Sequence, residues 1–231
     1  MISGMIEVMP ANVPSIQAVV FDYGKVLSFE PTPDQWHRLA ATAGRPLEEF
    51  RHDYWLYRDE YDRAGCGPVS YWQAVARRLL DAESLRRLIE YDNQQWTRVN
   101  PQMLALSRRL RAAGVKTAIL SNMEFEMLAE LRAKFAWLKE FAPLVFSCEL
   151  RMVKPEIEIF RHTAALLGVE PGKILFLDDK PRNIDGARCV GMQALLFDSP
   201  EKIAAVEDLL RAQGIILPGV EEIATVMQAR G

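Results

Sequence analysis

The stretch AVVFDYGKVLSF, residues 18–29, decides the fold. Its first four residues are apolar without alternation, the run ends at the carboxylate of Asp22, and Gly24 stands two residues further on. A continuous apolar run of this kind is typical of a parallel strand that is covered on both faces. We therefore expect a buried strand over 18–21, with a carboxylate at its carboxyl end.

Further runs of the same kind predict a parallel sheet. They are TAIL at 117–120, LVF at 144–146, ILFL at 174–177 and ALLF at 194–197. Helical stretches separate the later runs: Asn100 and Pro101 begin one that ends at Gly114, and Pro155 begins another that ends at Gly168. Strands that alternate with helices predict an α/β fold, here a Rossmann-like three-layer core around a parallel sheet.

Residues 30–100 interrupt this alternation. They lack a β-branched run and contain four stretches, rich in Trp, Tyr, Arg and Leu, that predict helices. An insert of this length far exceeds an ordinary α/β connection. We expect a helical cap over 30–100, inserted after the first strand into a core formed by residues 1–29 and 101–231. Residues 1–16 are expected to form a loose N-terminal arm, and residues 214–231 to add one further helix.

The composition limits which binding partners and which cellular compartment we expect. The chain has 231 residues and a net charge of −3, which gives no reason to expect nucleic acid or an anionic membrane as a partner. No apolar run approaches the ~20 residues that span a bilayer. The three cysteines are odd in number and far apart, so we expect a reducing cytoplasm. The sequence leaves the oligomeric state open.

Polar side chains follow three of the predicted strands. The first strand ends in Asp22, the second in Ser121 and Asn122, and the ILFL strand in Asp178 and Asp179. Ligands bind beyond the carboxyl ends of the strands in an open parallel sheet, so these side chains are expected to meet at one mouth. Clustered carboxylates cannot all stay ionised without a cation, and Mg²⁺ prefers such oxygen ligands.

Each of these residues also has an ordinary structural interpretation. A single Asp after an apolar run is most often a turn or a helix cap. Ser121 or Asn122 could simply begin the next helix, and Lys154 before a proline could be a solvated loop lysine. Their order along the chain is what favours a functional site.

That order resembles the haloacid dehalogenase superfamily. The motifs are D-x-G-x-V-L from Asp22, an apolar run with S-N at 121–122, K-P-E from Lys154, and L-D-D-x-x-x-N at 177–183, and the resemblance covers roughly residues 17–200. It also explains the helical insert, which sits where that superfamily places its cap. The stretch FDYGKVL is similar to a branch that includes proteins like glucose-1-phosphate phosphatase and the N-terminal phosphatase of epoxide hydrolase.

The resemblance implies a role for each matching residue. Asp22 would be the nucleophile that forms an aspartyl-phosphate. Lys154 would neutralise a phosphate oxygen and orient Asp22. The remaining roles are Mg²⁺ binding by Asp22, Asp178, Asp179 and the backbone carbonyl of Gly24, phosphate binding by Ser121, Asn122, Lys154, Gly24 and Lys25, and support of the site by Asn183.

Gly24 departs from the superfamily pattern. Most phosphatases of the superfamily carry a second Asp there, which protonates the leaving oxygen and activates the incoming water. Such a group is worth ~10²–10⁴-fold in rate. The metal ligand survives, because only the backbone carbonyl at this position is needed. We therefore expect a preference for good leaving groups, such as those of anomeric sugar phosphates or acyl phosphates.

The cap is expected to choose the substrate. Tyr57, Arg58, Tyr61 and Arg63 are candidates to bind a sugar and its phosphate, although aromatic residues on a helix more often pack in a core. The predicted function is a Mg²⁺-dependent phosphatase of small phosphorylated metabolites, with sugar phosphates as one candidate class. One alternative is a metal-independent 2-haloacid dehalogenase, against which Gly24 and the paired carboxylates argue. The other is a non-catalytic binding protein of the same fold.

Overall fold

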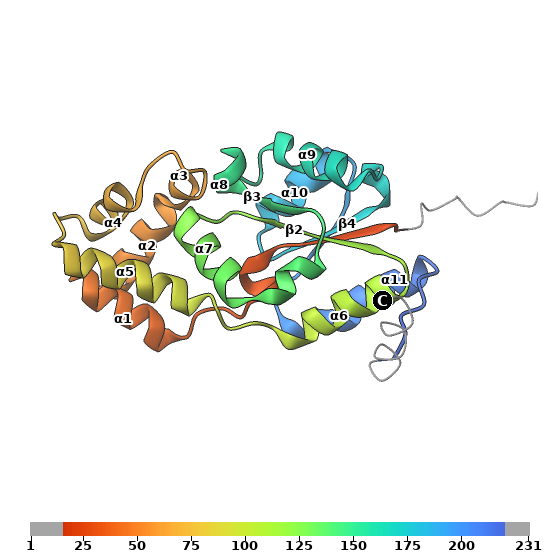
Figure 1. Ribbon diagram of the computed structural model, residues 1–231, viewed down its shortest axis with the longest axis horizontal. Helices are drawn as coiled ribbons and strands as arrows, with labels where there is room; N and C mark the ends of the chain where they lie inside the picture. Colours follow the sequence, from red (N-terminus) through yellow and green to blue (C-terminus); the bar gives the residue numbers. More distant parts are fainter. Residues whose placement is uncertain (1–15, 220–231) are drawn as a thin grey trace, which may run out of the picture.

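A parallel sheet of five strands organises the part of the chain that the computed structural model describes, residues 16–219. The strands lie in the order β3-β2-β1-β4-β5, so β1 is central (Figure 1). Their bounds are Ala18–Phe21 (β1), Lys116–Ser121 (β2), Leu144–Phe146 (β3), Ile174–Asp178 (β4) and Gln193–Leu196 (β5). Every neighbouring pair is parallel, which confirms the predicted sheet.

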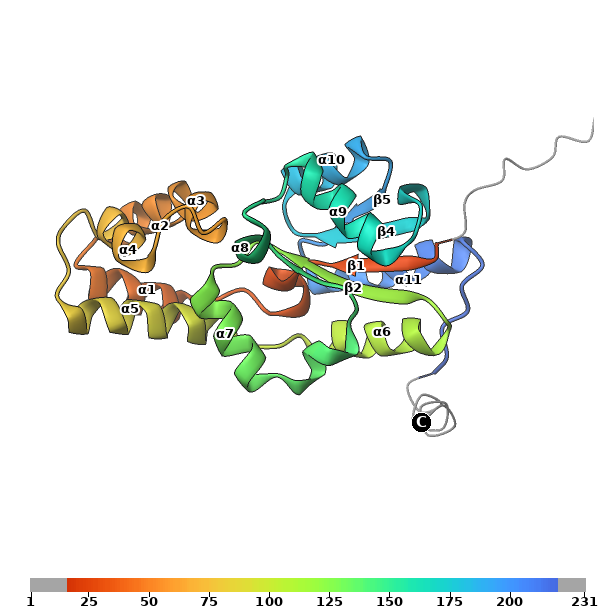
Figure 2. The ribbon, with the colours of Figure 1, turned by 45° about the horizontal axis from the view of Figure 1, so that its top comes forward.

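Helices cover both faces of the sheet. Figure 2 shows α9 (Ile157–Leu167) and α10 (Pro181–Cys189) on one side, with α6 (Pro101–Ala112) and α11 (Ile203–Ala212) on the other. Alternate residues of β1 enter two separate hydrophobic cores: Val19 and Phe21 pack with α6 and α11, whereas Ala18 and Val20 pack with α9 and α10. The three-layer Rossmann-like fold is therefore confirmed. The inner strands β1, β2 and β4 are buried on both faces over most of their length, whereas the edge strand β5 is half-buried.

Shorter elements complete the core. They are η1 (Tyr23–Leu27), α7 (Phe125–Lys134), η2 (Ala136–Glu140), α8 (Ser147–Leu150), η3 (Pro171–Lys173) and η4 (Pro200–Lys202). The expected start of α6 is confirmed, because Asn100 Oδ1 accepts hydrogen bonds from the backbone N–H groups of Gln102 and Met103. The expected start of α9 at Pro155 is wrong. A turn closed by the hydrogen bond from Glu156 N–H to Val153 O, 2.8 Å, occupies this segment, and the helix begins at Ile157.

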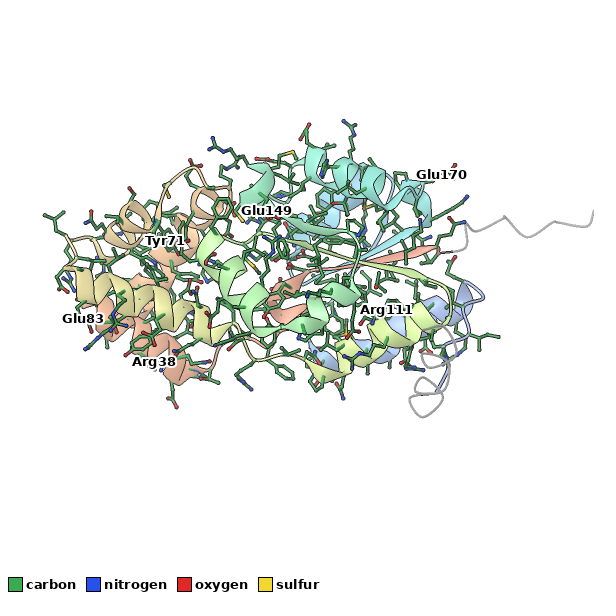
Figure 3. The ribbon with its side chains drawn as sticks, in the orientation of Figure 1. Arg38, Tyr71, Glu83, Arg111, Glu149 and Glu170 are labelled. Carbon is green, nitrogen blue, oxygen red and sulfur yellow. The ribbon has the colours of Figure 1, made fainter. Side chains whose placement is uncertain are left out.

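The insert between β1 and β2 holds five helices, not four. They are α1 (Pro33–Ala43), α2 (Leu47–Leu56), α3 (Arg58–Asp62), α4 (Pro68–Ala76) and α5 (Ala82–Gln95), which we call the cap. The chain breaks its helix at Tyr57, so one predicted helix becomes α2 and α3. The cap has a hydrophobic core of its own, and Figure 3 shows Tyr71 inside it.

The structure describes the two ends of the chain only in part. Most of the predicted N-terminal arm lies outside the described residues, and Ile16, its last residue, is buried. The predicted C-terminal helix also lies largely outside them, and the described part, 214–219, is not helical. No helix among the described residues is both long and apolar enough to cross a membrane.

Candidate active site

Asp22 lies where β1 ends, at the mouth of the sheet. Its backbone N–H still belongs to the sheet, because it donates to Leu177 O of β4 at 2.9 Å. The chain then turns sharply through η1, and the Asp22 carboxylate accepts a hydrogen bond from Tyr23 N–H at 2.6 Å. The side chain is 6% exposed. The fold thus holds a carboxylate at the centre of the sheet's carboxyl edge.

Lys154 joins two carboxylates beneath this mouth. Its Nζ lies 2.8 Å from Asp22 Oδ1 and 2.6 Å from Asp178 Oδ2, and the residue is 1% exposed. Burial alone would lower the pKa of Lys154, but Asp178 and Asp22 together hold that pKa above its ordinary value. Lys154 is therefore a buried ammonium group and not a solvated loop lysine.

Asn122 holds Lys154 in place through the backbone. Asn122 Oδ1 accepts from Lys154 N–H at 2.8 Å, and Asn122 Nδ2 donates to Lys154 O at 3.0 Å. The Asn122 side chain is therefore occupied by the Lys154 backbone. Neither Ser121 nor Asn122 caps the following helix, because α7 begins at Phe125 after Glu124.

Asp178 is fixed by the protein itself. Its Oδ1 accepts from Lys180 N–H at 2.8 Å and from Asn183 Nδ2 at 2.9 Å, while Oδ2 accepts from Lys154. Asn183 sits in the first turn of α10, so the helix start and the strand end are tied together. Both oxygens of Asp178 thus have partners in the protein, and the side chain is fully buried.

Three carboxylates gather at this point. Asp22, Asp178 and Asp179 each offer an oxygen, and these oxygens lie within 4.8 Å of one another. Burial raises the pKa of Asp22 to about 7, with Asp178 and Asp179 adding to the rise and Lys154 opposing it. Burial and Asp178 also raise the pKa of Asp179. A cluster short of positive charge, made only of oxygen donors, fits a hard divalent cation such as Mg²⁺.

A cavity of about 190 Å³ opens between this cluster and the cap. All the core residues predicted for the site except Asp178 line it: Asp22, Gly24, Lys25, Ser121, Asn122, Lys154, Asp179 and Asn183. Lys25 Nζ lies 3.1 Å from Glu30 and 3.8 Å from Asp179, so it sits beside the carboxylate cluster. The residues that the sequence motifs singled out thus lie around one cavity.

The cap residues predicted to face this cavity are mostly elsewhere. Only Arg58 lines it. Tyr61 stacks on Tyr71 inside the cap at 4.3 Å between ring centroids, and Arg63 pairs with Glu156 of the core at 2.7 Å. Tyr57 is 36% exposed and does not line the cavity. The prediction for Tyr57, Tyr61 and Arg63 as cavity residues is therefore wrong.

Arg58 anchors the closed arrangement of cap and core. Its guanidinium pairs with Asp62 at 2.8 Å, with Asp92 at 2.9 Å and with Glu124 of the core. Further contacts cross the same interface, among them Arg182 to Asp59 at 2.7 Å. Because three carboxylates surround it, Arg58 is committed to holding the cap and has little capacity left for a substrate.

The side chains that the cap gives to the cavity were not singled out from the sequence. They include Trp36 of α1, then Arg51, Tyr54 and Trp55 of α2, and Trp96 follows α5. A signal was present, since residues 51, 54, 55 and 58 follow the spacing of one helical face. That spacing shows that the residues share a face, but not which surface the face meets.

Comparison with known proteins places the chain in a family. The model of the haloacid dehalogenase-like hydrolases matches residues 16–191. The chain belongs to this family. Phosphatase MT3486 of Mycobacterium tuberculosis is 30% identical over 218 residues, which cover 89% of this chain and 98% of the relative. This haloacid dehalogenase-like hydrolase therefore has a full-length relative named as a phosphatase.

Other members of the family carry different names. The (S)-2-haloacid dehalogenase of Xanthobacter autotrophicus is 30% identical over 215 residues, covering 88% of this chain and 82% of the relative. Among solved structures, the family enzyme BT-2542 of Bacteroides thetaiotaomicron, in complex with magnesium and inorganic phosphate, has a TM-score of 0.62 at 19% identity. That match covers 78% of this hydrolase and 93% of BT-2542 and supports the shared fold.

Proposed function

We propose that this hydrolase is a Mg²⁺-dependent phosphatase of small phosphorylated metabolites that works through an aspartyl-phosphate on Asp22. The observation that carries the proposal is the placement of Asp22 at the cavity, 2.8 Å from Lys154 and within a cluster of three carboxylates. A haloacid hydrolase has no need of this carboxylate cluster, whereas a phosphatase uses a cation to bring two anions together. The phosphatase relative agrees with this choice.

The residues divide the work as follows. Mg²⁺ held by Asp22, Asp179 and the Gly24 carbonyl would supply positive charge opposite the phosphate oxygens. Ser121 Oγ and the Asn122 backbone N–H would donate to those oxygens, with Lys25 nearby to offset their charge. Lys154 neutralises charge beside the attacking Asp22 oxygen. Asp178 and Asn183 keep Lys154 oriented.

The reaction would run in two displacements. In the first, an oxygen of Asp22 bonds to phosphorus while the ester P–O bond breaks, and the leaving oxygen departs with the electron pair and takes a proton from solvent. In the second, water attacks the same phosphorus, the Asp22–phosphorus bond breaks, and inorganic phosphate forms. Two moderate barriers thus replace one high barrier.

A single pair of assays tests this proposal. The protein is given p-nitrophenyl phosphate and, separately, 2-chloropropionate, each with Mg²⁺ and with EDTA. We expect phosphate release that needs Mg²⁺ and no chloride release. Chloride release that persists in EDTA would establish the dehalogenase instead. Silence on a panel of phosphate esters that includes sugar 1-phosphates would favour a non-catalytic protein.

Restoring the missing acid is expected to change leaving-group preference. Gly24 has φ −64° and ψ 127°, which suit any residue, and a Cβ added there would meet only the Trp96 ring at 3.7 Å. Gly24→Asp should therefore fold, and its carboxylic acid can protonate the leaving oxygen. We expect kcat/KM to rise about 100-fold for alkyl phosphates and by less than about threefold for aryl phosphates.

The matched control for that variant is Gly67→Asp in the cap. A Cβ at Gly67 meets nothing within 4 Å, so this change adds the same charge away from the cavity. Phosphate release from glycerol 3-phosphate and from phenyl phosphate gives the two rates. An equal gain on both esters by Gly24→Asp would break the link between the missing acid and substrate preference.

Metal binding is expected to depend on pH. The pKa of Asp22 is raised to about 7, so a proton occupies Asp22 at about pH 5.5 and has mostly left it by about pH 8. The pKa of Asp179 is raised in the same direction. Mg²⁺ competes with protons for these carboxylates, and its binding stabilises the folded state. The increase in Tm on replacing EDTA with Mg²⁺ should therefore be larger at about pH 8. Equal increases at both pH values, or the same increase in Asp179→Asn, would contradict this assignment.

A further inference from the structure

Aromatic rings form the cap side of the cavity. Trp36 and Tyr54 meet edge to face at 5.0 Å between ring centroids, Tyr54 and Trp55 at 4.8 Å, and Trp55 and Trp96 at 6.4 Å. The polar atoms of two of them are taken, since Tyr54 Oη donates to Asp92 at 2.8 Å and accepts from Trp96 Nε1 at 3.3 Å. Trp36 Nε1 is buried and has no partner among the described residues. Trp55, at 37% exposed, offers the most open ring of this wall, and a ligand meets mainly aromatic carbon here. Such a wall suits a flat apolar body better than a polyhydroxylated one.

Arg51 is a cation at this wall that has no carboxylate partner. Among the described residues, Lys25, Arg58 and Lys154 of the cavity all lie in ion pairs. Lys180, also at the cavity, lies over Trp55 and offsets the charge of Asp179 and Asp62. The Arg51 guanidinium lies 5.3 Å from the Trp36 ring centroid, and among the described residues no Asp or Glu forms an ion pair with it. A guanidinium in this position matches a carboxylate on a ligand.

The leaving group must tolerate the absence of an acid at position 24. A phenol ionises near pH ~10, as tyrosine does, so a phenolate departs with much less help from a proton than an alkoxide. Gly24 therefore favours aryl esters for a reason that does not involve the cap. The cavity wall and the missing acid select the same kind of leaving group independently.

We propose that the substrate is an aryl phosphate whose ring carries a carboxylate, with the ring packed against Trp36 and Trp55 and the carboxylate bound by Arg51. The proposal rests on the phosphatase function and names its substrate class. The reacting phosphate would lie at Asp22 and Lys154, and the released product would be a hydroxyaryl carboxylate and inorganic phosphate. Arg51 is thus a specificity residue, and Arg58 is a structural one.

The test compares two esters of nearly equal shape. We expect kcat/KM for 4-carboxyphenyl phosphate to exceed that for its neutral amide, 4-carbamoylphenyl phosphate, by about tenfold, the worth of one charge-assisted hydrogen-bonded pair. In Arg51→Met this ratio should fall to about one. The matched control is Arg38→Met, which removes a cation that lies 4.1 Å over Tyr91 on the outer side of the cap, away from the cavity (Figure 3). Arg38→Met should leave the ratio unchanged.

A binding measurement separates this proposal from the phosphatase function. Three of the five tryptophans line the cavity, so 4-hydroxybenzoate, the product, should quench intrinsic fluorescence in the wild type and in Asp22→Asn, and more weakly in Arg51→Met. Binding without phosphate release from any ester would overturn the phosphatase function alone. Phosphate release with equal rates on the two esters, or with faster turnover of glucose 1-phosphate, would overturn the substrate class alone.

Discussion

Asp22→Asn is expected to lower phosphate release by about four orders of magnitude, because an amide cannot attack phosphorus and the two-step route is lost. The substitution keeps the size of a side chain that is 6% exposed and leaves Lys154 paired with Asp178 at 2.6 Å. Single-turnover phosphate release with phenyl phosphate and Mg²⁺ measures the loss. A residual rate within tenfold of the wild type would show that Asp22 is not the nucleophile.

The same variant should be more stable than the wild type at high pH in EDTA. The pKa of Asp22 is about 7 in the folded protein and near its ordinary value of 3.8 in the unfolded chain. Between those values the folded state binds one more proton, so this residue lowers stability as pH rises through the window. Asn carries no charge, and the gain in Tm should be larger at about pH 8 than at about pH 5.

Asp208→Asn is the matched control for both effects. Asp208 lies on α11 with a side chain that is 71% exposed, and it pairs with Arg211 on the same helix. Activity should stay within about twofold of the wild type, as for most surface substitutions. A Tm for Asp22→Asn that lay below that of Asp208→Asn at high pH would contradict the buried-charge argument.

The sheet could be predicted because its inner strands, β1, β2 and β4, are buried on both faces. Each run of apolar residues was short, continuous and followed by a polar residue, and the structure places every one of them in the sheet. Helix boundaries that depend on single turns could not be predicted from the sequence. Tyr57 ends α2 and so divides one predicted helix, and the bond from Glu156 N–H to Val153 O delays the start of α9.

The core half of the site could be predicted for a geometric reason. Asp22, Ser121 and Asp178 end parallel strands, and the register of those strands brings their ends together. The use of Asn122 to hold the Lys154 backbone leaves no mark in the sequence, because it depends on how two loops approach each other.

The cap half could not be predicted in the same way. Which helical face meets the core is decided by docking contacts between residues distant in sequence, such as Arg58 with Glu124 and Ser147 Oγ with Asp62 O at 2.7 Å. The spacing of residues 51, 54, 55 and 58 is that of one helical face, but it gives no means of choosing Arg51 over Arg58 as a cation without an ion pair. The ion pairs of Arg58 with Asp62 and Asp92 show that its guanidinium is already occupied.

Lys154→Met is expected to remove activity and to lower the free energy of unfolding by about 3–5 kcal/mol near neutral pH, because it leaves two buried carboxylates without their shared cation. Asp22 and Asp178 would keep their burial, at 6% and 0% exposed, and lose contacts of 2.8 and 2.6 Å. Urea unfolding followed by circular dichroism measures the stability, and phosphate release measures the activity.

Acid should reduce this loss of stability. With Lys154 gone, nothing opposes the burial and the like charges that already raise the pKa of Asp22 to about 7, so its proton is held to still higher pH. A folded-state pKa above the unfolded one means that stability is greatest at low pH and falls as pH rises. The deficit of Lys154→Met relative to wild type should therefore be smaller at about pH 5 than at about pH 8.

Two further variants separate charge from geometry. Lys173→Met removes a lysine whose ion pair with Glu170, 3.1 Å, lies at the surface, and it should change stability little and independently of pH. Lys154→Arg keeps the charge but cannot place one nitrogen between Asp22 and Asp178 as Nζ does, so it should recover stability more than activity. A Lys154→Arg protein as active as the wild type would show that charge alone suffices at this position. If Lys154→Met were too unstable to purify, Lys154→Arg would still test the same geometry. We expect that variant to be nearly as stable as the wild type but to release phosphate more slowly.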